Sequence, residues 1–450
     1  MKGEELAAQS PWLTQMPPPA PPLEGEREAD VCVIGGGFAG LSCALALRGE
    51  GLDVVVLEAE SAGYGASGRN AGHLTPTIGK DLPTLCSLYS EEKVRGLVRL
   101  ASTSIAHVEG LIRDHAIECD YEPVGNVISA VHPKQHASIE RAARAAQAHD
   151  LEGELLDAAG MERRGLPRSF TCGYHETRGG VLDPGKLLRG IRAAALAAGS
   201  ALHEGSPATQ IHDGSPAVVE TPRGRVRCRH VVIATNAYTP SLGRLRSAAL
   251  RIQVQLFHTE PLTPAQREAV GWAGRAGIYT AHEILESYRW TADHRILGGS
   301  KFIRAGYGDR VLPDTDPRLC ARLEAVFRER FPELPDVRVE RHWGGPIFMS
   351  LDFLPRVGRG GRHQNLLHAI GWAGHGVAQA SYAGVMLADL LCERAGPGAA
   401  LWSRRSIPLP PEPLRWLAFR GLTGWFESVD RRVDKAVVRR RPRPAVGRRS

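Results

Sequence analysis

The amino-acid sequence predicts an α/β fold in which a Rossmann-like domain is interrupted by a β-rich α+β domain. Three observations support this prediction. A glycine-rich turn follows an apolar strand near residue 35, and a second such turn follows another apolar run near residue 371. Between them, after residue 240, segments rich in strand-forming residues replace the alternation of strands and helices. A chain of 450 residues is long enough for two domains in one body.

Residues 30–58 are predicted to form a β-α-β unit. Gly35 allows a tight turn out of the first strand, and Gly37 lets backbone N–H groups approach a pyrophosphate closely. Gly40 lets the helix lie against the sheet, and the helix N-terminus offers its positive dipole end to phosphates. Glu58 ends the second strand and can accept hydrogen bonds from a ribose diol. Because the strands and the spaced acid accompany the glycines, the motif predicts a dinucleotide site rather than an ordinary turn.

Other elements follow from capping and periodicity. Asp183-Pro184 predicts a helix that ends at Gly199, and Asp316-Pro317 predicts another. Further segments are expected as a helix over 90–117, a buried strand over 228–235, strands at 252–257 and 287–290, and a hairpin turn at 292–295.

Four further stretches are dense in glycine and small polar residues, which suits backbone that lies along an extended ligand. They are 63–73, 234–240, 343–358 and 371–376. Together with the first unit they resemble the FAD-dependent amine oxidoreductases of the D-amino-acid oxidase and glycine oxidase superfamily, above all its gamma-glutamylputrescine oxidoreductase branch. The resemblance covers about 12–430, from the lead-in at Ser10-Pro-Trp12 to the prolines at 408–411.

The resemblance implies an FAD/NAD(P)-binding Rossmann-like domain with FAD as cofactor. The β-α-β unit would hold the ADP half, and residues 67–70 would lie along the ribityl chain and ring. The helix that starts at Gly376 would face the flavin N1–C2=O edge, where its dipole favours the negative charge of reduction. The predicted cofactor-binding residues are Gly35, Gly37, Phe38, Ala39, Gly40, Glu58, Ala59, Ser67, Gly68, Arg69, Asn70, Gly72, His73, Gly371, Gly374, His375, Gly376 and Val377.

The implied reaction is hydride transfer from the carbon beside a neutral amine to flavin N5. The imine then hydrolyses to an aldehyde or ketone and an amine, and O2 or another acceptor takes the electrons. The substrate would be a small amine or amino acid. Alternatives are an oxidase or dehydrogenase for sarcosine, glycine or D-amino acids, and a flavin-binding partner subunit without turnover. Which amine is oxidised, and whether the enzyme is an oxidase or a dehydrogenase, stay open.

No acid or base is assigned from the sequence. Lys301 is either a cation that promotes oxygen reduction or a surface lysine, and His375 is either a base or simply placed by its glycine neighbours. His73 is expected to form a hydrogen bond or to be solvated, with a covalent flavin link as the alternative.

The substrate class depends on which charged side chain points into the pocket. Arg289 or Arg304 would suit a carboxylate substrate, whereas Glu283 or Glu286 would suit a polyamine. Aromatic candidates for an apolar pocket wall are Trp372, Tyr288 and Trp290.

The predicted domains are an extended lead-in (1–28), a discontinuous FAD domain (29–80, 165–240, 340–400), a substrate domain (81–164, 241–339) and a basic C-terminal extension (401–450), expected to be solvated and disordered. The formal net charge is +7, but residues 401–450 alone contribute +9, so the remaining chain is not basic and no nucleic-acid partner is expected.

Composition also bears on metals and location. Eight scattered cysteines without metal-type pairing predict a reducing, cytoplasmic setting. No metal site, export signal or transmembrane segment is predicted, and the oligomeric state stays open.

Overall fold

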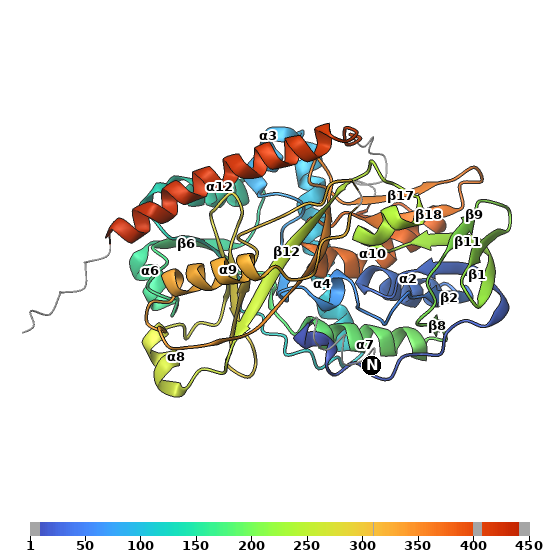
Figure 1. Cartoon of the computed structure of the whole chain (residues 1–450), viewed down its shortest axis with the longest axis horizontal. Helices are drawn as coiled ribbons and strands as arrows, with labels where there is room; N and C mark the ends of the chain where they lie inside the picture. The colour runs from blue at the N-terminus through green and yellow to red at the C-terminus, as the bar shows by residue number, and fades with distance from the viewer. Residues whose placement is uncertain (1–9, 309, 399–406, 441–450) are drawn as a thin grey trace, which may run out of the picture.

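The computed structural model describes residues 10–308, 310–398 and 407–440 (Figure 1). Two large sheets lie side by side, each with its own helices. The first is built from residues 25–57, 201–233 and 356–370, and the second from residues 126–176 and 250–349.

The first sheet carries the predicted β-α-β unit. Its strands run in the order β17 (Arg356–Gly360), β18 (Leu366–Ile370), β11 (Gly224–Ile233), β1 (Gly25–Ile34), β2 (Val54–Leu57) and β8 (Ala201–His203), with β10 (Ala217–Glu220) and β9 (Gln210–His212) beside β11. From β18 to β8 the strands are parallel, and β17 is an antiparallel edge. Buried apolar residues on both faces of β1 and β2 are typical of a parallel sheet covered on both sides.

Four helices pack on this sheet around one apolar core: α2 (Phe38–Gly49), α4 (Glu91–Asp114), α7 (Pro184–Ala197) and α10 (Gly376–Leu391). The crossing of α10 over α2 depends on Gly384, because a Cβ there would lie 2.3 Å from the backbone of Ser42. The caps predicted at Asp183 and Asp316 are present, and each carboxylate accepts a backbone N–H of its own helix.

The second sheet is mostly antiparallel. Its order is β16 (Val339–Met349), β12 (Leu250–Thr259), β15 (Ile296–Gly299), β14 (Ser287–Trp290), β13 (Gly277–Thr280), β4 (Asn126–Ala130), β6 (Cys172–Glu176) and β5 (Gly153–Leu156). β13 and β4 pair in parallel. On those two strands Val127 and Ile278 point into a core that also contains Phe257 and Phe331. The opposite face of the sheet is therefore free to line a site.

The remaining elements are shorter or peripheral. They are η1 (Pro11–Leu13), η2 (Ala66–Gly68), β3 (His73–Leu74), α3 (Leu82–Leu88), η3 (Pro133–Gln135), α5 (His136–Ala148), α6 (Ala158–Arg163), β7 (Gly180–Val181), η4 (Asn236–Leu242), α8 (Pro264–Val270), α9 (Pro317–Arg330) and α12 (Leu414–Arg440). Among the described residues, no helix is both long and apolar enough to cross a membrane.

Three predicted boundaries are wrong. Strands β6 and β16 pair in the second sheet, although the prediction placed both in the FAD domain. Helix α4 packs in the core of the first sheet, although it was placed in the substrate domain. Periodicity shows that a segment is a helix or strand, but not which sheet it joins.

The C-terminal extension also differs from the expectation. Instead of a solvated tail, α12 runs along the second-sheet side of the molecule (Figure 1). Its Val433 and Val437 pack against the second core, and Asp430 is buried. The final residues 441–450, with most of the terminal arginine run, lie outside the described part.

Candidate functional site

A single large cavity joins the two sheets. Its volume is about 1160 Å³, and it extends from the Gly35 turn to β4, β6 and β13 of the second sheet. Pockets for drug-sized ligands are commonly about 300–1,000 Å³, so this one has room for a dinucleotide together with a small substrate.

The β-α-β unit forms one end of the cavity. Gly35 has a φ of +112°, and a Cβ at Gly40 would lie 1.8 Å from the carbonyl oxygen of Gly35, so both positions require glycine. Gly37, Phe38 and Ala39 line the cavity with the first turn of α2. This is the arrangement that binds a pyrophosphate.

Glu58 lies where a ribose would be held. Its carboxylate accepts the backbone N–H of Gly36 over 2.6 Å and that of Glu60 over 3.0 Å. Burial raises the pKa of Glu58, although these hydrogen bonds oppose the shift. One carboxylate thus orders the glycine turn and also faces the cavity.

The glycine-rich loop at 63–73 connects the two ends. Ser67 accepts the N–H of Phe38 over 2.9 Å at the start of α2. The Arg69 guanidinium is not free to follow a ligand, because it binds the carbonyl oxygens of Tyr64 (2.7 Å) and Gly344 (2.9 Å) and pairs with Asp314 (2.5 Å). Arg69 therefore fastens this loop to β16 at the cavity wall.

The turn at 371–376 forms the opposite wall. Gly371 and Gly374 have φ values of +86° and +88°, and Asn236 accepts the N–H of Gly371 over 3.0 Å. The first turn of α10 then faces the cavity at Gly376 and Val377. Burial lowers the pKa of His375, which favours a neutral ring. Its Nδ1 is buried without a hydrogen-bond partner among the described residues.

Most of the predicted cofactor-binding residues line this one cavity. The exceptions are Gly40, Gly68 and Gly371. Gly40 and Gly68 are needed for close packing, since a Cβ at Gly68 would lie 2.4 Å from the carbonyl oxygen of Gly63. The two helix N-termini, the acid at the strand end and the orphaned His375 Nδ1 fit an extended anionic dinucleotide.

His73 lies at the junction of the first loop with the second sheet. Its Nδ1 is 2.8 Å from the side-chain oxygen of Asn126, while its Nε2 is buried without a hydrogen-bond partner among the described residues. Burial lowers the pKa of His73 to about 4, so the ring is neutral near pH 7. Gly277 makes room for it, because a Cβ there would lie 2.6 Å from Nδ1.

One face of the second sheet closes the cavity. Ile128, Tyr174, Glu176 and Tyr279 all line it. In the register of β6, β4 and β13, Glu176 is opposite Asn126, and the row with Tyr174, Ile128 and Tyr279 lies two residues along. Sequence analysis missed Glu176 and Tyr279, because a polar residue on an alternating strand has no motif around it.

The four charged candidates for substrate recognition lie in different places relative to the cavity. Only Glu283 lines the cavity, where it is exposed. Arg289 donates to the carbonyl oxygen of Trp290 (2.8 Å) and lies over the Trp12 ring. Arg304 pairs with Asp316 away from the cavity, and Glu286 is buried among cations. Of the aromatic candidates, Trp372 lines the cavity, whereas Tyr288 and Trp290 belong to the core.

The expectation of a surface position for Lys301 is wrong. The residue is 4% exposed, and its Nζ lies 2.9 Å from Glu286 and 3.2 Å from Asp434. It does not line the cavity. The residues next to Lys301 gave no signal for this pairing, since Asp434 is far away in sequence.

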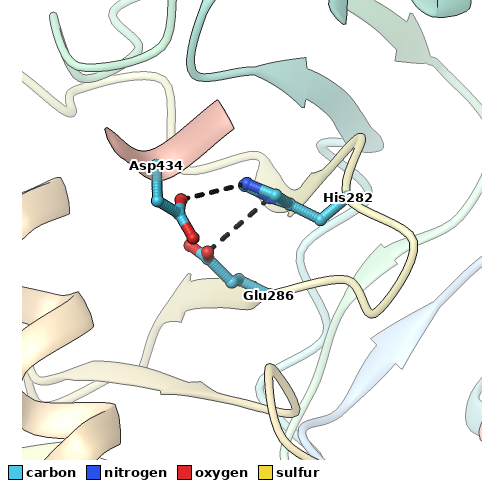
Figure 2. A group of neighbouring side chains, drawn as sticks. All are labelled: His282, Glu286 and Asp434. Atoms are coloured by element: carbon cyan, nitrogen blue, oxygen red, sulfur yellow. Dashed lines mark ion pairs between the residues drawn. The ribbon is translucent and has the colours of Figure 1, made fainter. Parts of the chain in front are cut away.

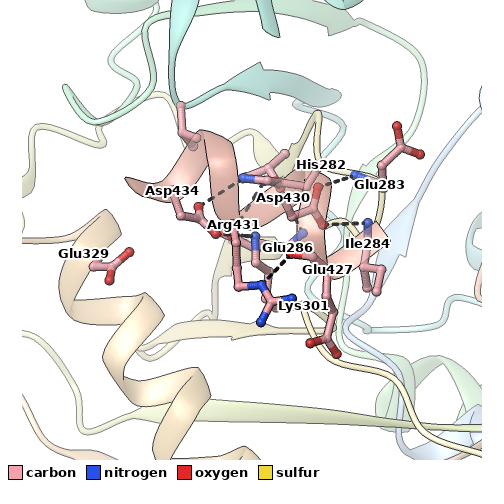
Figure 3. A network of polar contacts seen from close by, with 12 residues as sticks. His282, Glu283, Ile284, Glu286, Lys301, Glu329, Glu427, Asp430, Arg431 and Asp434 are labelled. Atoms are coloured by element: carbon pink, nitrogen blue, oxygen red, sulfur yellow. Dashed lines mark hydrogen bonds and ion pairs between the residues drawn. The ribbon is translucent and has the colours of Figure 1, made fainter. Parts of the chain in front are cut away.

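His282, Glu286 and Asp434 lie close enough to suggest a metal site (Figure 2). However, Lys301 and Arg330 already bind the same carboxylates, with Arg330 at 2.8 Å from Glu286 and 2.6 Å from Asp434. Two cations and two carboxylates balance one another without an added ion. The cluster is therefore an internal ion-pair network, which joins α12 to the second sheet (Figure 3), and the absence of a metal stays a prediction.

Comparison with known proteins identifies this architecture. The sequence profile of the DAO family, described as FAD dependent oxidoreductase, matches residues 30–390. The chain belongs to the DAO family. It is 32% identical over 368 residues to gamma-glutamylputrescine oxidoreductase of Escherichia coli K12, spanning 80% of this chain and 83% of that one. The match therefore confirms the family that the sequence motifs indicated.

Solved structures share this fold. Glycine oxidase from Geobacillus kaustophilus superposes with a TM-score of 0.71 at 21% identity, over 85% of this chain and 100% of the other. L-proline dehydrogenase from P. horikoshii gives a TM-score of 0.69 at 18% identity, over 82% and 94%. The DAO protein described here is thus an FAD-dependent oxidoreductase.

Proposed function

We propose that this DAO protein oxidises a CH–NH or CH–NH2 bond of a small amine. Bound FAD would accept the hydride at N5, and the imine product would hydrolyse to a carbonyl compound and an amine. The observation that carries the proposal is the continuous cavity, which extends from the nucleotide-type turn at Gly35 to the polar face of the second sheet. O2 or another acceptor would then remove the electrons.

The residues of this chain would contribute binding and electrostatics. Gly37 and Phe38 at the α2 N-terminus, with Glu58 at the end of β2, would hold the ADP half. The α10 N-terminus at Gly376 would stabilise negative charge near the reacting ring system. Arg69 would keep the intervening loop fixed on β16.

An amino-acid substrate has less support in this cavity. Neither of the two arginines that would bind its carboxylate, Arg289 and Arg304, lines the cavity. Arg141 and Lys80 line the cavity too, but Arg141 is exposed and Lys80 lies 3.7 Å from Asp81. The relative with 32% identity is named for a gamma-glutamylated diamine, which also favours an amine.

The test is anaerobic mixing of the flavin-loaded protein with a panel of amines and amino acids. We expect at least one amine to bleach the flavin band at about 450 nm. Recovery of the band in air identifies an oxidase, and persistent bleaching identifies a dehydrogenase that needs another acceptor. If no compound in the panel bleaches a fully loaded protein, the chain is a flavin-binding subunit without this activity.

A further inference from the structure

Glu176 is a buried carboxylic acid at the substrate end of the cavity. Its side chain lines the cavity although the residue is only 6% exposed. Tyr279 donates its hydroxyl to Oε2 over 3.0 Å. Among the described residues, no lysine or arginine forms an ion pair with Glu176, in contrast to Glu286, which is bound by two cations.

A buried carboxylate without a cationic partner is costly unless something else balances it. The surroundings of Glu176 do not balance its negative charge, because the groups that face it carry no positive charge near neutral pH. They are the phenols of Tyr279 on β13 and Tyr174 on β6, the amide of Asn126 on β4, and the imidazole of His73 on β3. His73 is neutral at pH 7 for the reason given above.

We propose that Glu176 binds the positively charged amino group of the substrate and takes one proton from it. The inference rests on the proposed amine oxidation and names its substrate class, a cationic amine. The ammonium N–H bond breaks and a carboxyl O–H bond forms, so that R–NH3⁺ and carboxylate become R–NH2 and carboxylic acid. The amine lone pair is thereby freed, which is the state from which a hydride can leave the neighbouring carbon.

The titration behaviour of the surrounding groups agrees with this role. Burial raises the pKa of Glu176 to about 7, although the hydrogen bond from Tyr279 opposes the shift. Burial also raises the pKa of Tyr174 to about 12 and that of Tyr279 well above its usual value. Glu176 is thus the group on this face that exchanges a proton near neutral pH, as a base for this step requires.

Glu283 strengthens the expected preference of the cavity for a cationic substrate. It is exposed at the cavity, on the loop between β13 and β14, whereas Glu176 is enclosed. A substrate ammonium would therefore meet one carboxylate on entry and a second at the sheet.

The experiment measures anaerobic flavin reduction by 1,4-diaminobutane, its mono-N-acetyl derivative, sarcosine and glycine from pH 6 to pH 10. It compares the wild-type holoenzyme with Glu176→Gln. Glu152→Gln is the matched control, because Glu152 is exposed and outside the cavity.

For Glu176→Gln we expect a loss of about 100-fold in kcat/KM for the cationic amines at pH 7. The deficit should shrink by about tenfold per pH unit above 7, because only the neutral fraction of the amine, which grows with pH, can then react. Wild-type rates should rise with pH through about 7, the pKa of Glu176. Glu152→Gln should match the wild type.

If the amines reduce the flavin of the wild type, and Glu176→Gln shows the same pH profile as the wild type, the proposed role of Glu176 is wrong and amine oxidation still holds. No reduction of the wild type by any compound would refute the proposed function itself, and this inference with it. Should Glu176→Gln fail to bind flavin, Glu176→Asp replaces it. That variant keeps a carboxylic acid on a side chain shorter by one methylene, so the rise of the rate with pH should persist at a lower rate. A pH profile of Glu176→Asp without this rise would likewise overturn the inference.

Discussion

The carboxylate of Asp430 accepts the backbone N–H of Glu283 over 2.9 Å and that of Ile284 over 3.1 Å (Figure 3). Asp430 belongs to α12, and Glu283 belongs to the loop that borders the cavity. The C-terminal helix thus holds part of the wall of the proposed substrate site, and its Phe426 lines the cavity directly.

Replacing Asp430 should therefore loosen the loop at 281–286. For Asp430→Ala we expect KM for the amine substrate to rise severalfold while flavin content stays unchanged, because the nucleotide end of the cavity is distant. Steady-state kinetics and the flavin-to-protein absorbance ratio provide the measurement. Glu427→Ala, on the same helix at a partly exposed ion pair, is the control. A KM equal to that of the wild type would show that the loop holds its position without the two hydrogen bonds that Asp430 accepts.

Removing the hydroxyl of Tyr279 should shift the acid limb of the pH profile. The hydrogen bond from Tyr279 lowers the pKa of Glu176 against the effect of burial, so its loss raises that pKa further above about 7. For Tyr279→Phe we expect the rise of kcat/KM with pH to move to higher pH. If the rise of kcat/KM moves to lower pH instead, the hydrogen bond from Tyr279 does not lower the pKa of Glu176.

The ion-pair network under α12 should be needed for stability. Glu286 is 1% exposed and bound by Arg330 and Lys301, so neutralising it leaves buried cations without a partner. For Glu286→Gln we expect a loss of about 3–5 kcal/mol in the free energy of unfolding, as is typical of a broken buried pair. Urea unfolding of the holoenzyme measures it. Glu91→Gln, at an exposed helix pair, should cost less than about 1 kcal/mol.

The same network predicts acid sensitivity. Burial alone would raise the pKa of Asp434, but its hydrogen bond to His282 and the charges of Lys301 and Arg330 lower it to about 2. A carboxylate with a depressed pKa in the folded state stabilises the fold above its unfolded pKa of about 3.9. This stability is lost as the pH falls from about 4 toward about 2. Thermal unfolding measured at a series of pH values should show this loss of stability. In Asp434→Asn the stability should depend less on pH over the same range.

Glu58 should contribute to the affinity for FAD. Its carboxylate holds the Gly36 N–H and faces the cavity, so Glu58→Gln keeps the shape but removes a charged acceptor. We expect the Kd for FAD to rise by about 10- to 100-fold. Fluorescence titration of the apoprotein measures this, with the exposed Glu28→Gln as control. An unchanged Kd would mean that Glu58 only orders the turn.

The sequence by itself determined the nucleotide end of the molecule. Gly40 and Glu58 act through contacts within one β-α-β unit, so the spacing of the motif predicts the turn, the helix start and the acid beside it. Gly35 and Gly37 also lie close to Ala234 and Ser67, which are outside this unit. The second glycine turn at 371–376 was predicted for the same reason, and the helix capped by Asp183 begins where the prediction placed it.

Only the tertiary structure decided the proposed substrate end of the cavity. Glu176 and Tyr279 lie about a hundred residues apart and meet because β6 and β13 both pair with β4. Lys301 is buried because Asp434 reaches it from α12, in a region that composition alone suggested was disordered. Local spacing encodes turns and caps, whereas the pairing of distant strands and charges depends on the whole chain closing on itself.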